Sequence, residues 1–225
     1  MNPVIYDEFM MYFEEENKEK AVPYVLDLLK NKEIDVIELY VNLLTPALNN
    51  LSCPKEEEKI SIWKEHIKTA IVRTIVECAY PYVMEKKNEI HKEWKGTAVV
   101  LCPSEEYHDL GARMVTDFLT ICGYETIFVG SNTPQLDFYH AISMIRPEII
   151  AISVSNYYNI VVTKKMIQQI KEKVDYKPAI IVGGNAFNYD SNKYKVVDAD
   201  YFARTYEDLV EITGQIKGGN YETRV

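Results

Sequence analysis

The chain has 225 residues, 47% of them hydrophobic and 26% charged, and its formal net charge of −9 argues against a broad electrostatic footprint on DNA or RNA. Its four cysteines, Cys53, Cys78, Cys102 and Cys122, lack the Cys-x-x-Cys spacing of a zinc site, and no apolar run reaches the roughly 18 residues of a membrane span. Because the N-terminus is acidic and unlike a signal peptide, the sequence predicts a soluble cytoplasmic protein.

Residues 1–95 contain no glycine and carry apolar side chains at helical spacing. Four segments show this spacing, and they begin at Ile5, Lys20, Asp35 and Glu56. Asp35 is a suitable N-cap for the third segment, and Pro81 is expected to kink or divide the fourth. We therefore predict an N-terminal domain, residues 1–95, that is a bundle of four or five helices.

From residue 96 onward, strand-forming runs alternate with helical patterns. Strands are expected at 98–103, 125–130, 148–154, 179–183 and 201–203, with helices near 109–122, 135–145, 159–173 and 205–217. The sequence Thr-Tyr-Glu-Asp at 205–208 is a capping box for the last helix. This alternation predicts an α/β domain, residues 96–225, with a five-stranded parallel sheet of the flavodoxin-like or Rossmann-like kind.

The turn after the first strand reads "SEEYHDLGARM", residues 104–114, and contains neither the glycines of a dinucleotide fold nor those of a P-loop. It does place His108 close to carboxylates. Histidine is the commonest transition-metal ligand, and a ligating histidine usually gives its other ring N–H to a carboxylate such as Glu106. Gly111 leaves room for a ligand near the start of the helix. The turn fits a metal with one protein ligand, whose other ligands come from a macrocycle.

Three motifs in this order resemble the cobalamin (vitamin B12)-binding domain family. Glu106-x-His108-Asp109-x-Gly111 resembles the family's Asp-x-His-x-x-Gly signature, although the first acidic residue is a glutamate here. The other two motifs are a serine-containing turn after the third strand and a glycine pair after the fourth, at Ser153-Val154-Ser155 and Gly183-Gly184. In the helical half, "EHIKT" at 65–69 is similar to the Glu-His-x-x-Thr of the four-helix cap of many members.

The resemblance implies how a cofactor is bound. Cobalamin would bind with its own benzimidazole detached, and His108 would replace that base as the lower axial ligand of cobalt, with Glu106 on its other nitrogen. Ser153 would extend this relay or touch the nucleotide tail, and Ser155 would line the tail channel. The remaining residues implied to contact the cofactor are Asp109, Gly111, Gly183, Gly184 and, from the cap, Glu65 and His66.

Three functions follow from this resemblance. The first is a sensory or regulatory protein that binds methylcobalamin or adenosylcobalamin and acts through a protein partner. The second is a methyl-carrying corrinoid protein of a methyltransferase system, although such carriers read Lys-Asn after the glycine where this chain reads Ala112-Arg113. The third is an interaction module whose cofactor site is degenerate. None makes the chain a complete enzyme alone, and the sequence leaves oligomerisation open. The Trp-His pair of light-sensing members is missing from residues 53–59.

Overall fold

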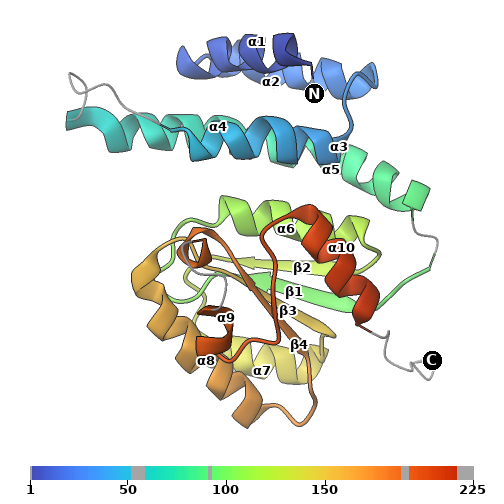
Figure 1. Ribbon diagram of the computed structural model, residues 1–225, viewed down its shortest axis with the longest axis vertical. Coiled ribbons are helices and arrows are strands. Elements are labelled where there is room, and N and C mark those ends of the chain that lie inside the picture. Colours follow the sequence, from blue (N-terminus) through green and yellow to red (C-terminus); the bar gives the residue numbers. More distant parts are fainter. Residues whose placement is uncertain (1, 52–58, 91–92, 189–192, 217–225) are drawn as a thin grey trace. The chain divides into compact units, whose positions relative to one another are not determined.

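A computed structural model describes residues 2–51, 59–90, 93–188 and 193–216 (Figure 1). The chain separates into two compact units, residues 1–86 and residues 87–225. The predicted domain boundary between residues 95 and 96 stays a prediction. Among the described helices, none combines the length and hydropathy that crossing a membrane requires.

The first unit is helical, as predicted. Its elements are α1 (Pro3–Glu14), α2 (Lys18–Lys30), α3 (Val36–Glu38), the π-helical turn η1 (Leu39–Leu44), α4 (Thr45–Asn49) and α5 (Ser61–Ile90). Because α3, η1 and α4 follow one another without a break, they form one helical stretch, and the unit has four such stretches among its described residues. The start of the predicted fourth segment, residues 56–58, lies outside them.

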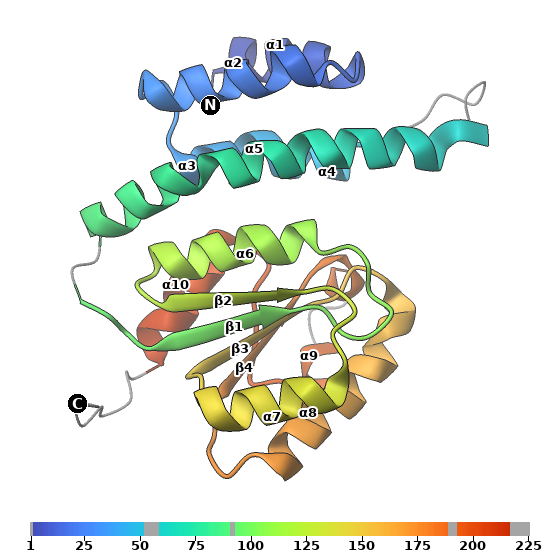
Figure 2. The same cartoon turned by 180° about the vertical axis from the view of Figure 1, so that it is seen from behind.

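Pro81 does not divide the longest helix, because α5 continues through it to Ile90. Both views show the last part of α5 leaving the line of its first part, as expected of a proline inside a helix (Figures 1 and 2). The core of this unit includes Phe9 and Phe13 of α1, whose rings stack with centroids 5.4 Å apart. On α5, Lys68 is buried and its Nζ lies 2.5 Å from the carboxylate of Glu14.

The second unit contains a five-stranded sheet in which every strand pair is parallel, as predicted. Its strands are β1 (Thr97–Leu101), β2 (Glu125–Gly130), β3 (Ile149–Ser153), β4 (Ala179–Gly183) and β5 (Tyr201–Phe202). Its helices are α6 (Leu110–Ile121), α7 (Gln135–Ile145), η3 (Tyr157–Asn159), α8 (Ile160–Lys173), η4 (Asn185–Phe187), α9 (Lys193–Val196) and α10 (Tyr206–Gln215). The predicted capping box of α10 is confirmed at Thr205 and Asp208.

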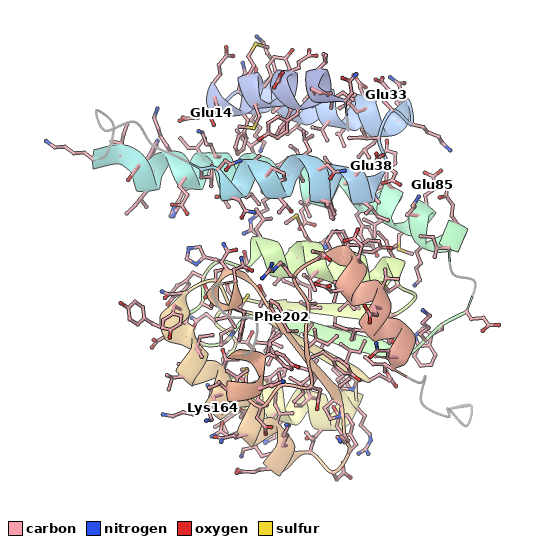
Figure 3. All side chains as sticks on the ribbon, in the orientation of Figure 1. Glu14, Glu33, Glu38, Glu85, Lys164 and Phe202 are labelled. Atoms are coloured by element: carbon pink, nitrogen blue, oxygen red, sulfur yellow. The ribbon has the colours of Figure 1, made fainter. Side chains whose placement is uncertain are left out.

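Helices cover both faces of the sheet: α6 and α10 lie on one face, and α7 and α8 lie on the other (Figure 2). The central strands are almost continuously apolar, which is typical of parallel strands buried on both faces. Helix α8 turns Met166 into the core and leaves Lys164 exposed (Figure 3). At the edge, Phe202 of β5 packs against Phe187, with ring centroids 6.1 Å apart.

The strand order β2-β1-β3-β4-β5 indicates which end of the sheet is suited to bind a ligand. After β1 the chain crosses to β2 on one side, and after β2 it returns to β3 on the other side of β1. The turns that leave β1 and β3 therefore diverge between two neighbouring strands. In open α/β sheets, ligands bind in the crevice at this switch point, beyond the carboxyl ends of the strands.

We expect the start of α3 to report on the stability of the helical unit. The Asp35 carboxylate accepts hydrogen bonds from the N–H groups of Ile37 (2.9 Å) and Glu38 (2.8 Å) and pairs with Lys86 (2.9 Å). Burial raises the pKa of Asp35, but these bonds outweigh it and hold the pKa below its ordinary value. Asp35→Ala should lower the free energy of unfolding by about 1 kcal/mol, the usual cost of a lost N-cap.

The sign of the pH effect follows from the lowered pKa. The stability from the Asp35 carboxylate is present above its unfolded-state pKa and is lost as the pH falls through the lower folded-state pKa. Denaturant titrations from neutral pH downward should show the difference between wild type and Asp35→Ala shrinking in that range. Asp35→Asn keeps a capping acceptor and is the control, so an equal loss in both variants at neutral pH would contradict the capping account.

Candidate functional site

The turn between β1 and α6, residues 102–109, is anchored at both ends. The backbone N–H of Cys102 donates to the carbonyl of Gly130 at the end of β2. The thiol of Cys102 is buried and lies 3.8 Å from the carbonyl oxygen of His108. Burial, together with the carboxylates of Glu106 and Asp109, raises the pKa of the Cys102 thiol to about 12, so it stays a neutral donor.

Glu106 joins this turn to the turn after β3. Glu106 is 0% exposed, and its carboxylate accepts hydrogen bonds from both turns. Oε1 accepts from the backbone N–H of His108 (3.2 Å) and lies 2.7 Å from Nδ1 of the same residue. Oε2 accepts from the N–H groups of Ser155 (3.0 Å) and Asn156 (2.8 Å) and from the side-chain amide of Asn159 (3.1 Å).

These donors keep Glu106 charged although it is buried. Burial raises the pKa of its carboxyl, while the hydrogen bonds from Asn156, His108 and Asn159 lower it by more, so the pKa lies below its usual value. A buried carboxylate without such partners would be costly. Glu106 is therefore a fixed anion between the ends of β1 and β3.

The fixed anion determines which face of the His108 imidazole is available. Nδ1 faces Glu106, so the neutral ring carries its proton on Nδ1 and leaves a lone pair on Nε2. The side chain of His108 is 63% exposed. An exposed imidazole whose other nitrogen is bound to a carboxylate is the arrangement expected of a metal ligand. Among the residues described, no three His, Cys, Asp or Glu side chains are grouped so as to hold a metal ion between them.

Sequence reasoning missed Asn159. This residue is buried and stands at the N-cap position of α8, yet its side chain makes no capping bond to that helix and donates to Glu106 instead. An asparagine before a helix is normally read as a cap, so the local pattern concealed this role. Asn159 thus adds a hydrogen-bond donor to Glu106 from the turn after β3. Both roles implied for Ser153, extending the relay or touching the nucleotide tail, stay predictions.

Gly184 and Gly183 let the ends of β3, β4 and β5 approach closely. Gly184 has φ of +98°, and a Cβ there would lie 2.4 Å from the carbonyl oxygen of Val154. A Cβ on Gly183 would lie 2.6 Å from the carbonyl oxygen of Ala203. Backbone packing at the carboxyl end of the sheet thus leaves no room for a side chain at either glycine. Contact of the two glycines with a ligand stays a prediction.

Gly111 has a different surrounding. In the first turn of α6, its missing Cβ would meet, among the described residues, only the hydroxyl of Ser153, 3.9 Å away, which is ordinary contact. A side chain would fit the protein there, but it would fill the space between α6 and the end of β3. Ser153 and Ser155 are half-buried at this end of β3. Contact of Gly111, Ser153 and Ser155 with the nucleotide tail stays a prediction.

The remaining predicted residues lie in the turn that carries His108 and in the helical unit. Asp109 is the N-cap residue of α6, directly after His108. Glu65 and His66 are exposed on α5, in the helical unit, so their contact with a ligand of the α/β unit stays a prediction.

The known proteins that this chain resembles are named for binding B12 or a corrinoid. The family model described as the B12 binding domain matches residues 96–212. Trimethylamine corrinoid protein 1 of Methanosarcina acetivorans is 25% identical over 187 residues, 79% of this chain and 81% of that protein. A corrinoid protein of Desulfitobacterium hafniense is 26% identical over 135 residues, 59% of this chain and 61% of that protein. The solved monomethylamine corrinoid protein of Methanosarcina barkeri shares the fold, with a TM-score of 0.80 and 15% identity over 96% of this chain and 100% of that one.

We expect Asn159→Leu to change the imidazole of His108. The variant has a similar volume but removes one donor from the buried carboxylate of Glu106, which should cost about 1–3 kcal/mol of stability. Because Glu106 sets the tautomer, ¹⁵N NMR of the ligand-free protein should show His108 moving from Nδ1–H toward a mixture of tautomers.

Thr163→Val is the matched control, because the Thr163 hydroxyl bonds to the Asn159 carbonyl (2.7 Å) one turn along α8 and is not a partner of Glu106. It should lower stability and leave the His108 nitrogens unchanged. If both variants leave those nitrogens unchanged, Asn159 serves folding alone.

A pair of glycine substitutions should have opposite effects on stability. Gly184→Ala puts a Cβ against Val154 at a φ that L-residues rarely adopt, so it should lower the free energy of unfolding by roughly 1–3 kcal/mol. Gly214→Ala lies in α10 with open space around the new Cβ and should raise it by about 0.5–1 kcal/mol. Urea unfolding measures both, and a Gly184→Ala variant as stable as wild type would contradict the close approach.

Proposed function

The chain belongs to the B12 binding domain family, and from this premise we propose that it is a cobalamin-binding methyl carrier that serves a methyltransferase. The observation that carries cofactor binding at this site is the exposed His108 imidazole, whose Nδ1 is held by the buried Glu106 carboxylate. The protein supplies the binding and orientation, and bound cobalamin supplies a cobalt ion that takes up and passes on a methyl group.

Each predicted residue has a role in this proposal. His108 would offer Nε2 as the lower ligand of cobalt, while Glu106 and Asn159 hold the ring in place and fix its proton on Nδ1. Gly111 and Ser153, which lie close together at this end of the sheet, would contact the nucleotide tail. The remaining residues proposed to contact the cofactor are Asp109, Ser155, Gly183, Gly184, Glu65 and His66.

The relatives favour the carrier over the sensor that the sequence alone favoured. The match to Trimethylamine corrinoid protein 1 spans 187 residues, which is longer than either structural unit, so it includes parts of both. Both curated relatives are named as corrinoid proteins. These matches support the proposal that the chain is a corrinoid carrier and that its protein partner is a methyltransferase.

Cofactor binding is tested first, in the dark, with hydroxo-, methyl- and adenosylcobalamin. After free cofactor is removed by gel filtration, the wild-type protein should retain cobalamin and show the absorption spectrum of a form with the benzimidazole detached. His108→Ala should weaken retention about 10- to 100-fold or change that spectrum, because the axial nitrogen is lost. His140→Ala, at an exposed position on α7, is the control and should behave as wild type.

Methyl transfer then separates the carrier from the other two functions. The protein loaded with hydroxocobalamin is first reduced with a chemical reductant, so that its cobalt can accept a methyl cation, and is then given a methylated amine as methyl donor. A methyltransferase that acts on Trimethylamine corrinoid protein 1 should methylate the wild-type protein under these conditions, and the loaded His108→Ala variant should be methylated more slowly. A protein that retains cobalamin but is methylated by none of the corrinoid methyltransferases supplied would be the sensor. A protein that retains no form of cobalamin would be the degenerate module.

A further inference from the structure

Three exposed tyrosines lie on the turn that carries His108 and on the turn after β3. Tyr107 stands between Glu106 and His108 and is 68% exposed, while Tyr157 and Tyr158 of η3 are 55% and 84% exposed. The rings of Tyr157 and Tyr158 meet edge to face, with centroids 6.5 Å apart. Single exposed aromatic residues are common on protein surfaces, but these three belong to the two turns that Glu106 connects.

The same hydrogen bonds that hold the imidazole also hold the tyrosines. Glu106 Oε2 accepts from Asn156 and Asn159, the residues on either side of the tyrosine pair. The Asn156 side chain in turn accepts a hydrogen bond from the backbone N–H of Tyr158 (3.0 Å). Tyr107 lies in the turn that Oε1 anchors through the N–H of His108. The backbone that carries all three rings is therefore fixed relative to Nε2 of His108.

We propose that Tyr107, Tyr157 and Tyr158 form a tyrosine platform on which the macrocycle of cobalamin rests when His108 binds its metal; this inference rests on the cofactor binding of the proposed function. A ligand that bonds to Nε2 and is much wider than an imidazole has to lie over the residues beside His108 on both turns. Tyrosine offers a large apolar face with little conformational entropy to lose, and its neutral hydroxyl suits the neutral amide groups at the edge of that macrocycle.

The electrostatics of the turns favour this occupant over an anionic one. The carboxylate of Glu106 is already engaged with donors, and the platform itself consists of uncharged rings. An anionic partner would find no cation in the platform and would be repelled by the exposed carboxylate of Glu105 in the same turn. An uncharged aromatic surface beside a metal-binding nitrogen fits a macrocycle that brings its own metal.

Chemical modification tests the platform directly, without any methyl transfer. The wild-type protein, with and without bound hydroxocobalamin, is treated with tetranitromethane, and nitrated tyrosines are located by mass spectrometry. Tyr107, Tyr157 and Tyr158 should each be nitrated at least about fivefold more slowly when cofactor is bound. Tyr80, 47% exposed, is the control because it lies on α5 about 20 Å along the helix from His66, at 1.5 Å per residue.

Binding measurements give a second readout. Tyr158→Ala and Tyr157→Ala should each raise the dissociation constant for hydroxocobalamin about tenfold, which corresponds to about 1.4 kcal/mol, and the phenylalanine variants should stay within about threefold of wild type. Tyr80→Ala should bind as wild type does. Because Tyr157, Tyr158 and Tyr80 are each about half exposed or more, all these variants should unfold within a few degrees of the wild-type temperature.

Equal nitration with and without cofactor, or wild-type binding by both alanine variants, would overturn the platform while leaving the carrier proposal intact. Protection that appears only after a methyltransferase is added would also overturn it, because the occupant would then be a protein. A wild-type protein that binds cobalamin and shields its tyrosines but accepts no methyl group would retain the platform and lose the carrier role.

Discussion

One buried carboxylate organises the functional end of the α/β unit. Glu106 is removed from water, and five donors from two turns compensate for that loss. Hydrogen bonds to an ionised group are stronger than those between neutral groups, and a buried charge without them would be costly. The position of His108, the conformation of the β3 turn and the placement of the exposed tyrosines all depend on this anion.

Glu106 has one methylene more than the aspartate of the family signature, and its longer side chain makes contacts with the neighbouring turn. Its second oxygen reaches the Ser155 and Asn156 amides and the Asn159 side chain in the neighbouring turn. Asn159 in turn gives up the helix-capping bond that its position favours. A local preference that is abandoned in this way is expected at functional sites, where stability is exchanged for the placement of a reactive group.

The sheet topology brings these parts together. The order β2-β1-β3-β4-β5 sets β1 beside β3, so turns that are about fifty residues apart in the chain meet at the same end of the sheet. Gly184 allows the backbone after β4 to pass against Val154, which closes the same end of the sheet on its other side. The family is described by its B12 binding, and the first curated relative is named as a corrinoid protein. The methyltransferase partner that we propose rests on that likeness.

Local patterns in the sequence were sufficient for the fold class. Helical periodicity without glycine predicted the first unit, alternating apolar runs predicted five parallel strands, and the capping box at Thr205 was read correctly, because each of these signals lies within a few residues. Pro81 illustrates the limit of such signals, because the sequence allowed either a kink or a break, and only the structure shows that α5 continues through it.

The pairing of His108 with Glu106 was also predictable from local spacing, because the two residues are two positions apart in one turn. The groups that hold this pair in place could be found only in the folded chain. Asn159 is 53 residues from Glu106 in the chain, and no periodicity or spacing connects the two. Their contact follows from the order in which five strands assemble, and that order depends on the packing of the whole unit.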